Sequence, residues 1–177
     1  RDSHTGAAAP PVQLGLSTGH ALRYGENPHQ AAWAYPTRSG AGVLQAKQLS
    51  GKELSYNNLA DAAAALDLVA DLGQNAPAAA AIIKHTHPCG AAAGDDPLAV
   101  LDDAWAGDPI AAFGGILALW SHVDLPLAEH IAQPGRFLEV ILAPKFSSEA
   151  SSRLAERWPN ARLLEYGELE AQPGDIA

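Results

Sequence analysis

The chain has 177 residues, of which 47% are hydrophobic and 18% charged, so it suits one globular domain rather than a disordered chain. Its net charge of -9 disfavours a general electrostatic grip on nucleic acid or anionic lipid, although a local basic pocket for one small anion remains allowed. The single cysteine excludes an internal disulfide framework and fits a reducing compartment. No apolar run approaches the roughly 20 residues of a membrane helix.

The N-terminal part of the chain is the least regular. Residues 1–19 are small and polar and contain proline, which predicts a linker or loose lead-in. Residues 22–35 are rich in turn formers and aromatics, and we expect an ordered loop there. A strand is predicted over 43–49. A helix over 59–72 follows, with Asn57 or Asn58 as its N-cap and Asp61 in its first turn.

From residue 78 onward, apolar runs alternate with helical patterns. The predicted strands are 78–83, 114–119, 137–142 and 162–166, and the predicted helices are 97–106, 124–133 and 147–158. A loop is expected over 91–96, and the end of the chain, 167–177, reads as a frayed tail. The alternation predicts an α/β domain with a mainly parallel sheet, in which ligands gather at the carboxyl ends of the strands.

The strongest local signal is Lys84-His85, at the predicted end of a buried strand. This position puts a cation and a titratable base where a pocket is expected, so the pair could bind an anion and move a proton. A loop of solvated polar residues is the alternative. Pro88 and Cys89 after the pair predict a sharp turn that leaves backbone N–H groups free.

His85, His87 and Cys89 alternate along the chain, so a zinc site has to be considered. Their spacing does not fit the familiar zinc loops, and a small buried cysteine beside two histidines is the favoured reading. Cys89 as a nucleophile is a further possibility, but Pro88 beside it favours turn chemistry.

Two further clusters offer groups that bind anions and planar rings. Arg23 and Tyr24 lie in the segment RYGENPHQ, where the planar guanidinium could hold a phosphate or carboxylate. Phe113 and Gly114 precede a predicted strand, where glycine lets the backbone approach a ligand and Phe113 could cover a ring. A surface loop and a tight turn, respectively, are the alternatives.

Two polar positions need partners or caps. Asn58 lies at a predicted helix start, where free N–H groups attract anions, although simple capping explains it as well. Glu139 lies within an apolar strand, so its carboxylate requires a partner in the protein or in a substrate.

Five collinear segments then carry a family resemblance: LRYGENPHQ, GKELSYNNLADA, IIKHTHPCG, DPIAAFGGI and FLEVILAP. In this order they resemble the transformylase part of the family that joins phosphoribosylaminoimidazolecarboxamide (AICAR) formyltransferase to IMP cyclohydrolase. The resemblance covers residues 20–166. It implies transfer of a formyl group from the co-substrate 10-formyltetrahydrofolate to the amine of AICAR, in the biosynthesis of purines.

The resemblance also implies roles for individual residues. His85 would take the proton from the amine, and Lys84 would orient the reactants and favour the leaving folate. Arg23 and Tyr24 would hold the nucleotide, with Arg23 at its phosphate. Further nucleotide contacts would come from Asn58, Phe113, Gly114 and Glu139. The fold implied is a three-layer domain related to cytidine deaminase, without its zinc.

Several departures from the family pattern stand beside this match. His87, Ala111 and Trp120 occupy positions where the family usually has other residues. The resemblance covers only the first half of the transformylase region, and in the family active sites form across a homodimer. We therefore expect a cytoplasmic enzyme fragment that is inactive alone. A zinc-dependent hydrolase or deaminase using His85, His87 and Cys89, and a non-catalytic nucleotide-binding module, are the alternatives.

Overall fold

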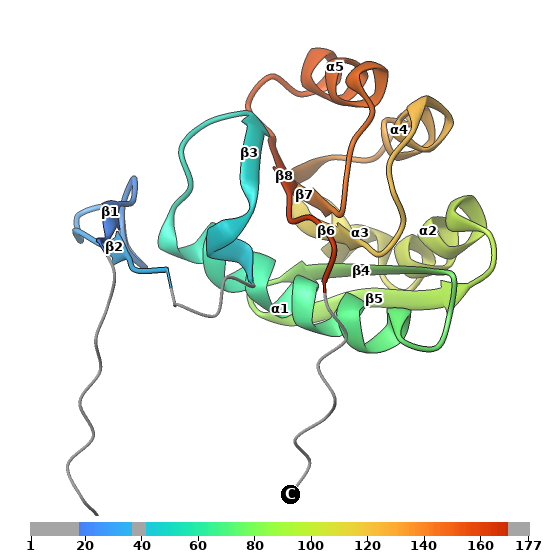
Figure 1. Cartoon of the computed structure of the whole chain (residues 1–177), viewed down its shortest axis with the longest axis horizontal. Coiled ribbons are helices and arrows are strands. Elements are labelled where there is room, and N and C mark those ends of the chain that lie inside the picture. The colour runs from blue at the N-terminus through green and yellow to red at the C-terminus, as the bar shows by residue number, and fades with distance from the viewer. Residues whose placement is uncertain (1–17, 37–41, 170–177) are drawn as a thin grey trace, which may run out of the picture.

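The computed structural model describes residues 18–36 and 42–169. They form a six-stranded sheet with helices on both faces, and a small two-stranded pair beside it on the side of β3 (Figure 1). The expected lead-in at 1–19 and tail at 167–177 lie mostly outside the described residues. None of the helices in the described ranges is long and apolar enough to cross a membrane.

The sheet has the strand order β3-β8-β7-β6-β4-β5. Its strands are β3 (Lys47–Ser50), β4 (Ala78–Lys84), β5 (His87–Gly94), β6 (Gly115–Leu119), β7 (Leu138–Ala143) and β8 (Arg162–Glu165). The small pair consists of β1 (His20–Ala21) and β2 (Trp33–Ala34). The helices are η1 (Val43–Gln45), α1 (Tyr56–Gly73), α2 (Pro97–Ala106), α3 (Pro109–Ala112), α4 (Leu125–Ile131) and α5 (Ser148–Arg157).

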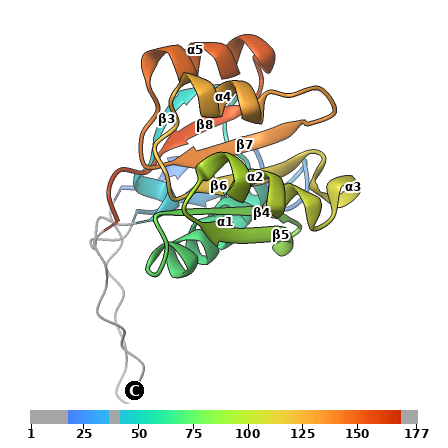
Figure 2. The same ribbon diagram turned by 90° about the vertical axis from the view of Figure 1, so that its right-hand side faces the viewer.

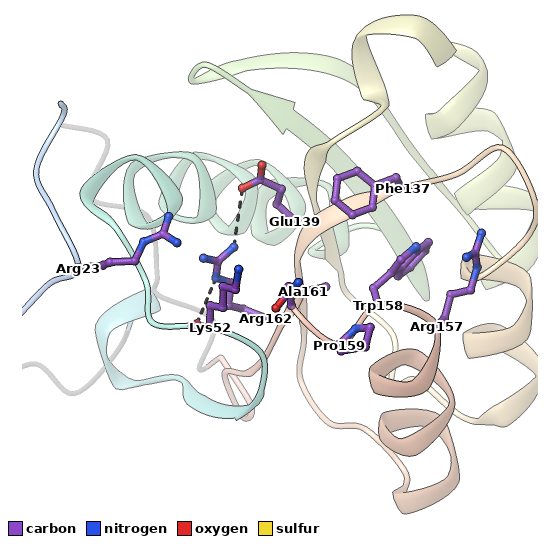
Figure 3. A pocket seen from close by; sticks show the side chains of 10 residues that line it. Arg23, Lys52, Phe137, Glu139, Arg157, Trp158, Pro159, Ala161 and Arg162 are labelled. Atoms are coloured by element: carbon purple, nitrogen blue, oxygen red, sulfur yellow. Dashed lines mark hydrogen bonds and ion pairs between the residues drawn. The ribbon is translucent and has the colours of Figure 1, made fainter. Parts of the chain in front are cut away.

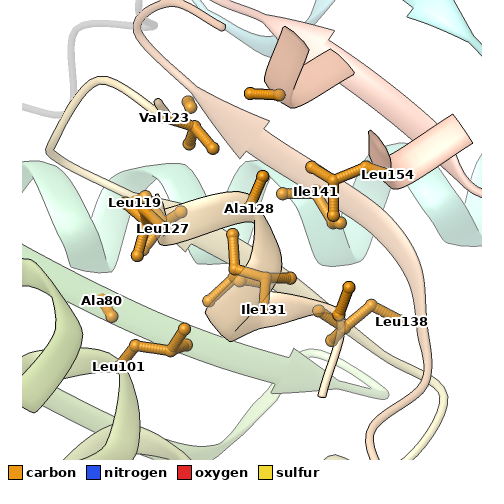
Figure 4. Packing of buried hydrophobic residues seen from close by; sticks show 14 of the residues in the cluster. Ala80, Leu101, Leu119, Val123, Leu127, Ala128, Ile131, Leu138, Ile141 and Leu154 are labelled. Carbon is orange, nitrogen blue, oxygen red and sulfur yellow. The ribbon is translucent and has the colours of Figure 1, made fainter. Parts of the chain in front are cut away.

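The sheet separates two apolar clusters, so the domain has three layers. Helix α1 packs against one face, while α2, α4 and α5 cover the other, as Figure 2 shows. Strand β4 is buried on both sides: Ala81 and Ile83 contribute to the α1 face, and Ala80 and Ile82 to the opposite face. Figure 4 shows the cluster on the face covered by α2, α4 and α5, where Ile131 of α4 lies among residues of the sheet and of α2.

The sheet is mixed, whereas the sequence predicted a mainly parallel one. β6, β7 and β8 run parallel, but β4 pairs antiparallel with both β5 and β6, and β3 pairs antiparallel with β8. A parallel arrangement would require the chain to cross back over the sheet between residues 83 and 114. The chain instead makes a hairpin there before α2, so it enters β6 from the opposite end of the sheet.

The hairpin arises because residues 87–94 form a strand where the sequence predicted a sharp turn and a loop. Glycine and proline normally disfavour strands, but β5 is an edge strand, so Pro88 costs no ladder bond on its open side. Ile82 pairs with Gly90 and Ile83 with Pro88, which leaves Cys89 as the extra residue of a β-bulge.

The helix starts follow local capping chemistry. Asp96, Asp108 and Asp124 accept backbone N–H groups at the starts of α2, α3 and α4, each with a proline one or two residues later. The expected cap of α1 was wrong: Ser55 is its N-cap, and Asn58 completes a capping box with it. The predicted strand at 43–49 begins instead as η1 and becomes β3 only at Lys47.

Candidate functional site

The candidate site lies at one end of the strands, where β4 finishes and β6, β7 and β8 begin. Because β4 is antiparallel to β6, the carboxyl end of β4 meets the amino ends of β6, β7 and β8. The candidate residues therefore lie at the starts of the three parallel strands, rather than at their carboxyl ends. Strand β4 brings its carboxyl end, with Lys84 at its last position and His85 after it, to this end of the sheet. Strand β3, antiparallel to β8, brings its carboxyl end there as well, followed by Lys52.

The β4–β5 connection presents His85. Lys84 pairs with His87, so His85 and Thr86 are the two central residues of the hairpin, and both have positive φ, 53° and 60°. Two-residue hairpin turns with this geometry usually contain asparagine or glycine. Here the carboxylate of Asp61 accepts the backbone N–H of both residues, at 3.1 Å from His85 and 2.7 Å from Thr86.

Lys84 points along the sheet edge to the turn before β6. Its Nζ donates a hydrogen bond of 2.8 Å to the carbonyl of Phe113. Gly114 follows with φ 76°, which favours glycine, and its N–H donates to the carbonyl of Phe137 at 2.8 Å. The rings of Phe113 and Phe137 lie 5.5 Å apart, and Phe113 is half exposed. Through Phe113, the ammonium group of Lys84 is thus linked to Phe137, which lines the neighbouring pocket.

That pocket has a volume of about 360 Å³ and opens at the starts of β7 and β8. Figure 3 shows Arg23, Arg162 and Glu139 on one side and Phe137, Trp158 and Arg157 on the other. The lining residues are Arg23, Lys52, Phe137, Glu139, Arg157, Trp158, Pro159, Asn160, Ala161 and Arg162. Four of them are cationic and one is acidic, so the pocket suits an anion although the whole chain is acidic.

Arg162 is the buried member of this group, with 5% of its side chain exposed. It donates to the carbonyls of Lys52 and Glu53, both at 3.1 Å, and its Nη1 lies 3.8 Å from Glu139 Oε2. Burial lowers the pKa of the Arg162 guanidinium, the positive charge of Arg23 lowers it further, and the Glu139 carboxylate opposes both. Arg162 thus fixes both the loop before α1 and the carboxylate at the start of β7.

Arg23 is held at the pocket rim by its neighbour in sequence. Its Nη2 donates to the Tyr24 hydroxyl at 2.8 Å, and its guanidinium lies 4.6 Å from the centroid of the same ring. The backbone is fixed as well, since the N–H of Arg23 donates to the carbonyl of Leu54 and the N–H of Tyr56 to the carbonyl of Tyr24. An exposed guanidinium held in this way is suited to a phosphate or carboxylate.

Glu139 has the partners that its position in an apolar strand demanded. Asn58, on α1, donates a hydrogen bond of 3.3 Å to Glu139 Oε2. Arg162, on β8, forms an ion pair with the same oxygen. About half of the Glu139 side chain, 48%, remains exposed toward the pocket. Asn58 is buried and serves two purposes, since its Oδ1 also accepts the N–H of Ser55.

The zinc alternative gains no support from the geometry. Within residues 18–36 and 42–169, no three His, Cys, Asp or Glu side chains are grouped to hold a metal ion. His87 places Nδ1 2.7 Å from the carbonyl of His85. Burial raises the pKa of the Cys89 thiol, so the reactive thiolate is disfavoured at neutral pH.

The structure thus brings most of the residues singled out in the sequence to one end of the sheet, and it adds others. Sequence reasoning missed the pocket cations Lys52, Arg157 and Arg162, and it assigned Asp61 only to the helix dipole. An arginine directly before two buried leucines of a predicted strand was the available signal for Arg162. Nothing local marks Asp61, because its partners lie 24 and 25 residues away.

Replacing Arg162 with methionine should lower the free energy of unfolding by about 2–3 kcal/mol, because two carbonyls and one carboxylate lose a partly buried donor. Urea unfolding at pH 7 measures this change. Arg153→Met on α5 is the control, since it also removes one cation but not a buried network. Equal stability of the two variants would show that Arg162 does not hold the pocket together.

Comparison with known proteins gives one consistent result. Residues 3–176 match the family model described as the AICARFT/IMPCHase bienzyme. The chain is similar to proteins named bifunctional purine biosynthesis protein PurH from three bacteria. They are those of Rhodopirellula baltica (46% identity, 84% of this chain and 29% of the relative), Acidithiobacillus ferrooxidans (48%, 85% and 28%) and Shouchella clausii (50%, 88% and 30%).

The chain therefore spans less than a third of the length of these relatives. The match nevertheless runs through every described element, from β1 to β8. On this evidence, the chain belongs to the AICARFT/IMPCHase bienzyme family.

Proposed function

We propose that this chain supplies the nucleotide pocket and the proton-transfer pair of an AICAR formyltransferase, an activity of purine biosynthesis that leads to IMP. One observation carries the proposal: the Lys84–His85 turn and the cationic pocket lie at the same sheet edge. Phe113 joins them, because its carbonyl accepts from Lys84 and its ring contacts Phe137 in the pocket wall.

In the proposed reaction, the amine nitrogen of AICAR attacks the formyl carbon of 10-formyltetrahydrofolate. The bond between that carbon and the folate nitrogen breaks, the amine loses one proton and the folate nitrogen gains one. His85 accepts the proton of the amine, because its residue is exposed on the turn and a neutral imidazole has a ring nitrogen that can accept a proton. Lys84 supplies positive charge where the folate nitrogen leaves, since an ammonium has three donors and Phe113 occupies one.

The nucleotide would bind across the pocket, with its phosphate at Arg23. Tyr24 orients that guanidinium, and Glu139 presents a carboxylate that can accept hydrogen bonds from ribose hydroxyls. Asn58 acts here by holding Glu139. The half-exposed ring of Phe113, above the tight turn at Gly114, offers a face for the imidazole base.

The wider architecture is part of the same proposal. Residues 20–166 act as the first half of a transformylase region, in a fold related to cytidine deaminase, within a cytoplasmic enzyme that forms a homodimer. The three layers and the α/β order support this relation, and the chain spans less than a third of its relatives' length, as expected for one part of such a region. The isolated chain is then expected to bind poorly and not to turn over.

Nucleotide recognition can be tested in a chimera in which this chain replaces the matched segment of the Rhodopirellula baltica relative. Arg23→Gln should weaken AICAR binding about 10-fold to 100-fold, because a charge-assisted pair with the phosphate is lost. Calorimetric titration measures the affinity. The control, Lys145→Gln, removes an exposed cation beyond the other end of β7. Equal affinities in the two variants would remove Arg23 from the proposed site.

A further inference from the structure

The turn that carries His85 is conformationally unfavourable by itself. His85 and Thr86 both lie in the left-handed region, with φ 53° and 60°. For residues other than glycine this conformation is uncommon, and for a β-branched residue such as Thr86 it is a genuine outlier. Such conformations persist only where surrounding contacts determine them, and they gather at functional sites.

Asp61 provides the surrounding contact. It lies in the second turn of α1, partly buried, and each oxygen of its carboxylate accepts one amide of the turn. Oδ2 is 3.1 Å from the nitrogen of His85, and Oδ1 is 2.7 Å from that of Thr86. With both residues left-handed, these two consecutive N–H groups point at one anion, so the carboxylate stabilises the turn in this conformation.

The same turn also fixes the carbonyl of His85. It accepts the Thr86 hydroxyl at 2.7 Å and lies 2.7 Å from His87 Nδ1. These contacts lie within the turn and move with it. Asp61 belongs to a different element, so it alone among these groups ties the turn to the packed body of the domain.

We propose that Asp61 is a positioning residue for the reaction: its carboxylate holds the Lys84–His87 turn left-handed and so places the imidazole of His85 beside Lys84. This inference rests on the proposed function, because it assumes that His85 is the proton acceptor. Asp61 acts through the backbone of the turn and takes no part in the proton transfer.

The first test uses the 177-residue chain and nuclear magnetic resonance. Asp61→Asn keeps the shape of the side chain but leaves only one oxygen to accept two amides. In this variant the HN–Hα couplings of His85 and Thr86 should shift toward right-handed or extended values, and both amides should exchange faster. Asp67→Asn, at an exposed position of the same helix, should leave them as in the parent chain. Parent-like couplings in Asp61→Asn would overturn the inference.

The second test measures turnover in the chimera. Asp61→Asn should lower kcat about 10-fold to 100-fold with little change in the KM for AICAR, as expected for a misplaced catalytic group. Adding Thr86→Gly should restore most of the loss, because glycine adopts the left-handed conformation without help. A loss that Thr86→Gly does not restore would show that Asp61 acts otherwise.

His85→Ala in the same chimera distinguishes failure of the positioning role of Asp61 from failure of the proposed function. If His85→Ala is inactive while Asp61→Asn is fully active, the positioning role fails and the proposed function stands. If His85→Ala remains active, the proposed function itself fails, whatever the couplings show.

Discussion

Replacing His85 with alanine in the chimera should lower kcat for formyl transfer by about 100-fold to 10,000-fold, the usual contribution of a positioned acid or base. The amine of AICAR must lose a proton as it attacks, and His85 follows Lys84 directly on the turn. His87 pairs with Lys84 across the hairpin, but its Nδ1 lies 2.7 Å from the carbonyl of His85. The affinity for AICAR should stay within about threefold, because the pocket groups lie on β7, β8 and the loops before α1.

His122→Ala is the matched control for this variant. It also removes an imidazole from the surface, but His122 follows β6 and pairs with Glu168 at the opposite edge of the sheet. Its kcat should equal that of the parent chimera. Steady-state assays with calorimetric binding of AICAR measure both quantities. If the kcat of His85→Ala matched that of His122→Ala, the role assigned to His85 would be wrong.

Replacing Gly90 with alanine should have the largest effect on the fold. A Cβ at this position would lie 2.0 Å from the carbonyl oxygen of Ala104 in α2, an atom of the helix backbone that cannot rotate away. Gly107 packs against the same place from the end of α2. Overpacking a well-packed interior costs about 1–3 kcal/mol and more where backbone must move, so we expect a loss of at least about 3 kcal/mol.

Gly94→Ala on the same strand is the control for this variant. Its added Cβ would meet only the Val100 methyl group at 3.2 Å, and that side chain can adjust. Urea unfolding should place Gly94→Ala within about 1 kcal/mol of the parent chain. Similar stabilities for the two variants would mean that β5 and α2 do not approach each other this closely.

The sequence predicted the elements whose signals are local. Apolar runs identified the buried strands β4, β6 and β7, and a proline in the first turn marked the starts of α2 and α4. Strand β5 was not predicted, because Pro88, Gly90 and the small residues after them are typical of a loop. They form a strand only through pairing with β4. Missing β5 led directly to the wrong prediction of a mainly parallel sheet.

The candidate site likewise contains residues with a local sequence signal and residues without one. Lys84 and His85 could be singled out because polar residues abruptly follow an apolar run. The contacts of Asp61 and Arg162 could not be predicted, because their partners are distant in sequence: Arg162 binds the carbonyl of Lys52, 110 residues earlier. Such contacts arise from the strand order, which places β8 beside β3, and local patterns carry no information about it.

The central claim is that this chain contributes the AICAR pocket and the catalytic pair to a formyltransferase. The most direct measurement is the rate at which formyl-AICAR forms from AICAR and 10-formyltetrahydrofolate, with the isolated chain and with the chimera. The account predicts turnover by the chimera and none by the isolated chain. A chimera that folds and binds AICAR but transfers no formyl group would contradict it and leave a nucleotide-binding module instead.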